Sequence, residues 1–341
     1  MDHSGVRAYD YLMILTMRKW RDGQAVPADT TGQLPSREVG EGELLWVDLA
    51  DPTPAELRSI GKHFGLTPLG MADVLEPHER TKVVRHPDHL SFVCYAAVGD
   101  TSNDNEDQAE AGFIFNMVRV SGFVFERLII TVRANTDFSV DTLQERWLEE
   151  QRLVRLGPSY LIYSILDTIV DEYFNYIETI EDRLEDIEDL LFEKVLTNEV
   201  QQRLYNIRRD LSHLRRAVSP MRELVIDFAR HFTAQTEMAG YYDDTYDHAL
   251  RASEWIDSLR DTISFIVETN LSLQDTRMNE IMKKLAAWAA IISVPTLVTS
   301  YFGQNLPFFG FNEHSGLIVS SVLLVGSAIM LWAAFRKSEW L

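Results

Sequence analysis

The chain has 341 residues, which is enough for two or three structural units. Its 52 acidic and 32 basic residues give a net charge of −20, which argues against nucleic acid as a partner, because phosphates require lysine and arginine. A single cysteine, Cys94, excludes an intramolecular disulfide and indicates a reducing compartment, and the opening MDHSGVRAYD predicts no secretory signal peptide.

Residues 1–150 are predicted to form a mixed α/β domain. Five runs rich in β-branched and aromatic residues predict strands, at 11–17, 44–49, 90–98, 112–120 and 127–134. Between the second and third of these runs, DPTPAELRSIGKHFG predicts a helix with early prolines and with Gly65 at its end. The polar stretch 99–112 predicts a hairpin loop.

Gly157 and Pro158 mark a change to long helices, which we assign to a helical stalk region at 151–280. Apolar residues step by three and four along three stretches of this region, as in packed helices. The three seams are Ile177, Ile180, Leu184, Ile187 and Leu191; Val200, Leu204, Ile207, Leu211, Leu214 and Val218; and Ala252, Ile256, Leu259, Ile263, Ile266, Asn270 and Leu273. Pro220 is expected to kink or break the second helix.

The acidic run EDRLEDIEDLLFE, residues 181–193, reads first as the solvated face of an amphipathic helix, and a cation-attracting rim is the alternative. The third helix meets neither proline nor glycine from Tyr241 to Val294, so it is expected to continue to Phe302 over about 90 Å at 1.5 Å per residue.

Two uncharged apolar runs near the C-terminus, 285–302 and 317–335, are just long enough to cross a bilayer. We therefore assign 281–341 to a transmembrane hairpin with a short basic tail; a buried hairpin in a soluble core is the alternative. The basic flanks lie at the two outer ends of the hairpin, and the connecting loop has no basic residue. The positive-inside rule then places both termini in the cytoplasm. The basic flanking residues are Lys283, Lys284, Arg336 and Lys337.

Four motifs in the same order resemble the CorA family of magnesium channels, and they span most of the chain. They are WVDLADPTPAELRSIGKHFGLTPLGMADVLEPHERTKV at 46–83, YYDDTYDH at 241–248, NEIMKKLAAWAAIISVPT at 279–296 and YFGQN at 301–305. The family hallmark Gly-Met-Asn reads Gly303-Gln304-Asn305 here. Methionine is also absent at this position in a zinc-transporting, ZntB-like branch of the family.

The resemblance implies an α+β cytoplasmic domain with a mixed sheet between helices, long stalk helices and a two-helix transmembrane hairpin, assembled as a homopentameric funnel. It also implies a multi-pass protein of the prokaryotic inner membrane that contacts the lipid bilayer. It implies no prosthetic group, with Mg2+ or another divalent cation as both substrate and regulator.

Five copies of Asn305, with Gly303 allowing close backbone approach, would form an amide ring that holds a hydrated Mg2+ through outer-shell hydrogen bonds. A purely structural role, as a helix C-cap followed by a turn, is the alternative for these residues. Glu313 in the loop could concentrate cations at the entrance, although the usual Met-Pro-Glu element is absent. His314 beside it offers a softer nitrogen ligand, and a solvated loop histidine is the alternative.

One face of the first span carries small and hydroxyl-bearing residues at helical spacing, which suits a wetted lumen in a pentamer or plain helix packing in a single chain. The residues of this face are Asn279, Met282, Ala286, Ala289, Ser293, Thr296 and Ser300. By the resemblance, Met282 and Leu285 match an apolar constriction that blocks ions by dewetting, and Asn279 matches an intracellular amide ring.

The family binds regulatory divalent ions between cytoplasmic domains, and Asp73 and Asp244 match the two acids of that site. Ala72 stands where the family has another acid, so Glu76, Asp243 and Asp247 are alternates. Asp73 could also simply cap or pair within its own helix.

Three functions remain open at this point: a magnesium channel that also passes cobalt or nickel, a ZntB-like proton-coupled zinc transporter, and a membrane-anchored coiled-coil scaffold. An enzyme is the least favoured, because the sequence shows no clustered nucleophile and base.

Overall fold

The computed structural model describes residues 14–27, 34–76, 79–99, 115–193, 198–232, 236–304, 310 and 313–341. The chain divides into two compact units, Met1–Ile263 and Ser264–Leu341. The predicted boundaries near residues 150 and 280 stay predictions.

The first unit is built on a seven-stranded mixed sheet with the order β2-β1-β3-β7-β6-β5-β4. Among the strands that the structure describes, β3 and β7 pair in parallel and the other neighbours pair antiparallel. The strands are β1 Ile14–Arg21, β2 Gln24–Val26, β3 Glu43–Ala50, β4 Lys82–Arg85, β5 Leu90–Gly99, β6 Phe115–Val124 and β7 Leu128–Arg133.

The five predicted strands correspond to β1, β3, β5, β6 and β7, and β3 and β5 end one residue, β1 and β6 four residues, past their predicted ends. β1 continues to Arg21 and β6 to Val124, while residues 11–13 and 112–114 lie outside the described residues, as does most of the predicted loop 99–112. The short strands β2 and β4 were not predicted. The left-handed Asp22-Gly23 turn (φ 52° and 80°) joins β1 to β2.

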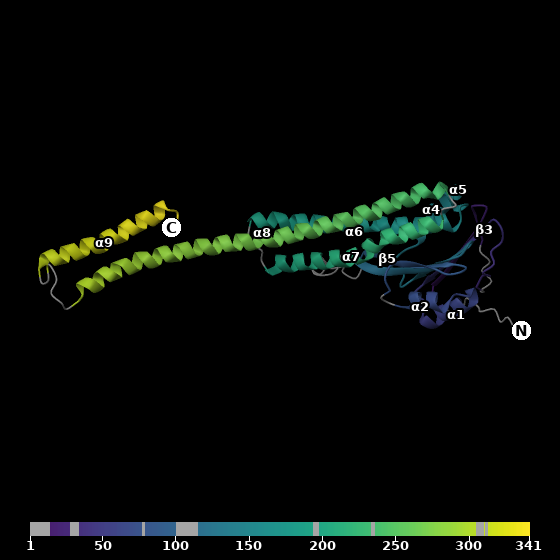
Figure 1. Ribbon diagram of the computed structural model, residues 1–341, viewed down its shortest axis with the longest axis horizontal. Coiled ribbons are helices and arrows are strands. Elements are labelled where there is room, and N and C mark those ends of the chain that lie inside the picture. The colour runs from purple at the N-terminus through teal and green to yellow at the C-terminus, as the bar shows by residue number, and fades with distance from the viewer. Residues whose placement is uncertain are drawn as a thin grey trace. The chain divides into compact units, whose positions relative to one another are not determined.

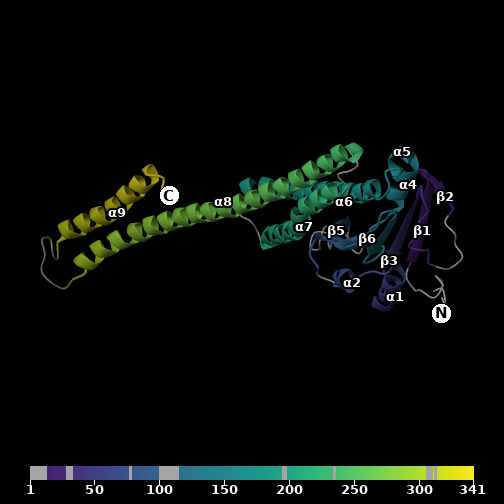
Figure 2. The same ribbon diagram turned by 45° about the vertical axis from the view of Figure 1, so that its right-hand side comes forward.

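Helices cover both faces of the sheet (Figure 2). On one face α1, Pro54–Phe64, and α2, Pro68–Leu75, bury apolar side chains against β3, β6 and β7. On the other lie α4, Asp141–Glu149, α5, Gln151–Val154, and α6, Pro158–Glu193. The predicted helix at 51–65 is confirmed, with a Thr53–Glu56 capping box and Gly65 in the left-handed region (φ 69°).

Figure 1 shows the long helices α6, α7, Asn198–His231, and α8, Thr236–Phe302. These three helices carry the predicted seams. The described members of the first two seams are buried except Val200, which is half-buried, and the third is buried as far as Asn270, whereas Leu273 is exposed. Of the two outcomes predicted at Pro220, the break is wrong, because α7 runs through this residue, and the kink stays a prediction. The carbonyl four residues earlier belongs to exposed Arg216, so water can satisfy the hydrogen bond that proline removes.

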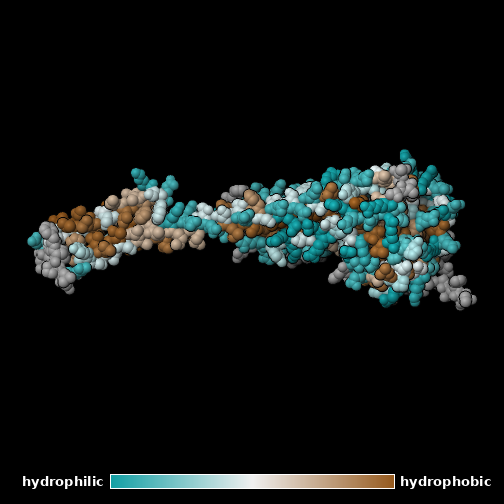
Figure 3. Space-filling model, in the orientation of Figure 1, coloured by the Kyte–Doolittle hydropathy of each residue, from teal (hydrophilic) through white to brown (hydrophobic). Residues whose placement is uncertain are grey.

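In the second unit, the C-terminal part of α8 and α9, His314–Lys337, present apolar side chains outward, and Figure 3 shows this as brown surface. Both helices are long and apolar enough to cross a membrane. Before α9, Gly310 (φ 86°) lies so close to Gly316 that a Cβ on Gly316 would stand 2.3 Å from the Gly310 carbonyl oxygen. Glycine is therefore required at this contact.

The predicted fold class is confirmed in its parts: a mixed sheet between helices, long helices after it, and a two-helix apolar hairpin. The pentamer stays a prediction.

Candidate metal-ion sites

The predicted pore face lies on the outside of α8. All seven of its residues, and Leu285 beside them, are exposed. The Thr296 hydroxyl donates to the Ile292 carbonyl at 2.7 Å, so its lone pairs remain available to a partner outside the helix. Exposed hydroxyls within an apolar span are costly against lipid, which favours a lumen or another helix as their neighbour.

At the end of α8, the Gly303 amide donates to the Thr299 carbonyl at 2.9 Å and the Gln304 amide to the Tyr301 carbonyl at 3.4 Å. A Cβ on Gly303 would stand 3.0 Å from that same Thr299 oxygen, so glycine suits this tight helix end. Asn305 lies outside the described residues, and its role in an amide ring stays a prediction.

The predicted entrance residues occupy the start of α9. Glu313 is the N-cap residue, and its carboxylate accepts a hydrogen bond from Ser315 Oγ at 2.9 Å. His314 is the first helical residue, and both side chains are exposed. A carboxylate at a helix N-terminus is also favoured by the helix dipole, so Glu313 has a structural reason to be there besides attracting cations.

Asp73 is largely buried on α2 and already has a cationic partner. Lys82 Nζ on β4 lies 2.9 Å from Asp73 Oδ1 and 3.3 Å from Glu79 Oε1. Burial lowers the pKa of Lys82, but its hydrogen bonds to the two carboxylates outweigh this and raise it overall. Asp73 therefore pairs within the chain, although with a strand rather than within its own helix, and a metal ion would compete with Lys82.

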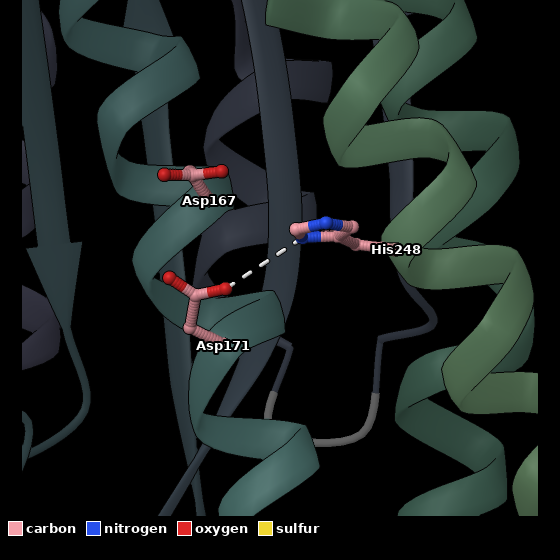
Figure 4. A group of neighbouring side chains, drawn as sticks. All are labelled: Asp167, Asp171 and His248. Carbon is pink, nitrogen blue, oxygen red and sulfur yellow. Dashed lines mark ion pairs between the residues drawn. The ribbon is translucent and has the colours of Figure 1, made fainter.

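Asp244, by contrast, is exposed on α8 and lies next to a group that sequence reasoning missed. His248 Nε2 stands 3.8 Å from Asp244 Oδ1, and His248 Nδ1 stands 3.8 Å from Asp171 Oδ1 on α6. One ligand atom each from Asp167, Asp171 and His248 fall within 4.8 Å of one another (Figure 4). We call these three residues the α6–α8 cluster.

The signal for this cluster was present in the sequence. Asp167 and Asp171 are four residues apart, as are Asp244 and His248, so each pair lies on one face of its helix. The sequence does not say that these two faces meet. The packing of α6 against α8 brings them together.

The members of the α6–α8 cluster are not equally available to an ion. Asp167 is nearly buried, and its carboxylate bonds to Arg146 Nη1 at 2.8 Å and to Thr245 Oγ1 at 3.3 Å. Asp171 is more exposed, and its pKa is raised by burial and then by the negative charge of Asp167. Carboxylate and imidazole groups together suit divalent cations.

These features indicate a membrane protein whose first unit carries carboxylate and imidazole groups of the kind that bind divalent cations. The family described as CorA-like Mg2+ transporter protein matches residues 41–337, and the chain belongs to it. It is therefore a divalent-cation transport protein of the membrane and not an enzyme.

Similar proteins span nearly the whole chain. YfjQ of Bacillus subtilis is 29% identical over 321 residues, covering 90% of this chain and 93% of that protein. The cobalt/magnesium transport protein CorA of Thermotoga maritima is 25% identical over 318 residues, covering 92% and 87%. The structure of the CorA magnesium transporter from Methanocaldococcus jannaschii has a TM-score of 0.74 at 22% identity, covering 96% and 99%.

Proposed function

We propose that the chain forms a homopentameric channel in a prokaryotic inner membrane and conducts Mg2+ into the cytoplasm. In this proposal residues 1–150 and 151–280 lie in the cytoplasm, and 281–341 form the membrane hairpin. The exposed small and hydroxyl-bearing face of α8, inside a span that is otherwise apolar, carries the proposal. Five such faces around an axis would enclose a wetted lumen.

Mg2+ gives up its water reluctantly, so a pore that selects it gains by binding the hydrated ion. Amide and carbonyl oxygens accept hydrogen bonds from that water without trapping the ion as a ring of carboxylates would. Gly303, Gln304 and Asn305 supply this chemistry at the outer end of α8. Further in, Met282 and Leu285 supply an apolar constriction that closes by dewetting.

Regulation is proposed to act through the first unit. Asp73 and the exposed Asp244 of neighbouring subunits would share a divalent ion, with Asp171 and His248 beside them. Close acids repel one another, and a bound cation cancels this repulsion and holds the ring closed. α8 carries both Asp244 and the pore face within a single helix, so it can transmit the change.

A proton-coupled zinc transporter on the same scaffold is the second candidate, and Gln304 in place of the family methionine favours it. Uptake of Mg2+, Co2+, Ni2+ and Zn2+ into liposomes holding the purified protein, with and without a pH gradient, separates the two. Mg2+ uptake that ignores the gradient supports the channel. Zinc uptake that requires the gradient, without Mg2+ uptake, contradicts it.

A further inference from the structure

We propose that the positive charge of Arg146, which pairs with Asp167, lowers the affinity of the α6–α8 cluster for divalent ions. The inference deepens the regulation proposed above and rests on it for its physiological meaning, although the binding chemistry can be tested by itself. A regulatory site must release its ion when the ion becomes scarce, and a fixed positive charge beside the ligands is one way to weaken binding.

The contacts of Arg146 show that its charge is directed at the cluster. Nη1 lies 2.8 Å from Asp167 Oδ2, and Nη2 donates to the Tyr163 hydroxyl at 3.1 Å. The guanidinium carbon also stands 5.4 Å from the centre of the Tyr163 ring. Burial lowers the pKa of Arg146, yet the hydrogen bond and attraction of Asp167 raise it overall, so the side chain is always charged.

The backbone of Arg146 is held in place by its neighbour. Trp147 is fully buried, and its indole N–H donates to Ser164 Oγ on α6 at 2.7 Å. Its ring meets those of Trp46 and Trp20 edge to face, at centroid distances of 4.6 and 5.7 Å. α4 is thereby fixed between the sheet and α6, and the guanidinium has little freedom to leave Asp167.

An ion at the cluster would meet this fixed charge. Asp167 is bonded through both oxygens, one to Arg146 and one to Thr245, so an ion that used it would have to displace a partner. For an ion held by Asp171 and His248 alone, the guanidinium would cancel the attraction that the Asp167 carboxylate otherwise exerts. A neighbouring charge shifts the proton affinity of a carboxylate by ~1–3 pKa units, and a divalent ion carries twice the charge of a proton. Removal of the charge should therefore tighten binding about tenfold or more.

The test is a titration of the purified full-length protein in detergent with Mn2+ alone, followed by calorimetry and by the electron paramagnetic resonance of free Mn2+. The variants are Arg146→Gln, Arg146→Lys, Asp167→Asn and the double variant Arg146→Gln/Asp167→Asn. We expect Arg146→Gln to lower the apparent Kd about tenfold and Arg146→Lys, which keeps the charge, to stay within about threefold of the wild type.

The double variant removes a neutral pair, so it should bind Mn2+ within about threefold of the wild type, whereas Asp167→Asn alone leaves the guanidinium uncompensated and should bind more weakly. This comparison stands even if Arg146→Gln fails to fold. Arg146→Gln with unchanged or weaker binding, or equal binding by Asp167→Asn and the double variant, overturns the inference. Ion flux in liposomes is measured separately. Failure of the transport proposal would appear as absent flux, whereas failure of this inference would appear in the Mn2+ affinities.

Discussion

The ion pair between Asp48 and Arg133 at the centre of the sheet allows a stability prediction to be worked from the structure. The two side chains are 0% and 7% exposed, and Arg133 Nη2 and Nε lie 2.7 and 3.1 Å from Asp48 Oδ2. Asp48 Oδ1 also accepts from Thr131 Oγ1 at 2.6 Å, and Thr131 accepts from the Trp46 indole at 2.9 Å.

Asp48→Asn keeps the shape but turns an amide NH2 toward the donors of Arg133 and leaves a buried cation without a counter-charge. Loss of one partner of a buried pair costs about 3–5 kcal/mol in the free energy of unfolding. For a unit of this size, 1 kcal/mol corresponds to about 2–4 °C, so Tm should fall by about 10 °C.

Thermal unfolding in detergent, followed by circular dichroism, measures this change. The matched control is Asp257→Asn, which breaks the half-exposed Arg215–Asp257 pair and should cost less than about 1 kcal/mol. Adding Arg133→Met to Asp48→Asn should recover part of the loss, because the unpaired charge is gone. A fall in Tm no larger than that of the control would refute the reasoning.

Three further changes test other parts of the structure. The pKa of His86 is lowered from 6.5 by burial and then by the charge of His89, whose ring stacks on it. The unfolded chain therefore binds more protons below pH 6.5, so the contribution of His86 to stability should be complete above that pH and decline as the pH falls. His86→Gln should flatten this decline in melting curves measured at several pH values. Gly122→Ala places a Cβ 2.4 Å from the Ile130 carbonyl oxygen of β7, so it should lower the free energy of unfolding by about 2–3 kcal/mol in denaturant titrations. The control Gly240→Ala has no atom within 4 Å of the added Cβ and should not lower the free energy of unfolding. Met282→Asn should wet the proposed constriction and raise Mg2+ leak about tenfold at high internal Mg2+ in liposome assays, and a leak equal to that of the wild type would contradict the constriction.

Periodicity predicted the long elements well because their pattern repeats many times. The seams on α6, α7 and α8 each contain at least five apolar residues, and almost all of the described members are buried. The break predicted at Pro220 is absent from α7, because the rule for proline concerns a lost hydrogen bond, and the sequence does not show that the freed carbonyl belongs to an exposed residue.

The missing short strands have a different cause. β2 and β4 contain three and four residues, too few for an alternating pattern to stand out from chance. They form because a neighbouring strand offers its edge, through the Asp22-Gly23 turn in the case of β2 and through β5 in the case of β4. The local sequence of a short strand does not determine tertiary pairing of this kind.

The candidate sites also differ in whether they depend on one helix or on contacts between elements. The pore face on α8 follows from the spacing within one helix, and its residues are exposed, as are Trp288 and Leu297 off that face, so its role in a pore stays a prediction. The α6–α8 cluster joins residues about 80 positions apart, and the Lys82 partner of Asp73 comes from another element. These contacts depend on which helical faces meet, which one sequence does not state.

Mg2+ uptake into liposomes by the wild type and by Asn305→Ala tests the central claim most directly, with an internal fluorescent Mg2+ indicator as the readout and assembly checked by size. The account predicts rapid uptake by the wild type and a loss of most of it, at unchanged assembly, in the variant. Equal uptake by the two proteins would contradict an amide ring at the mouth of the pore.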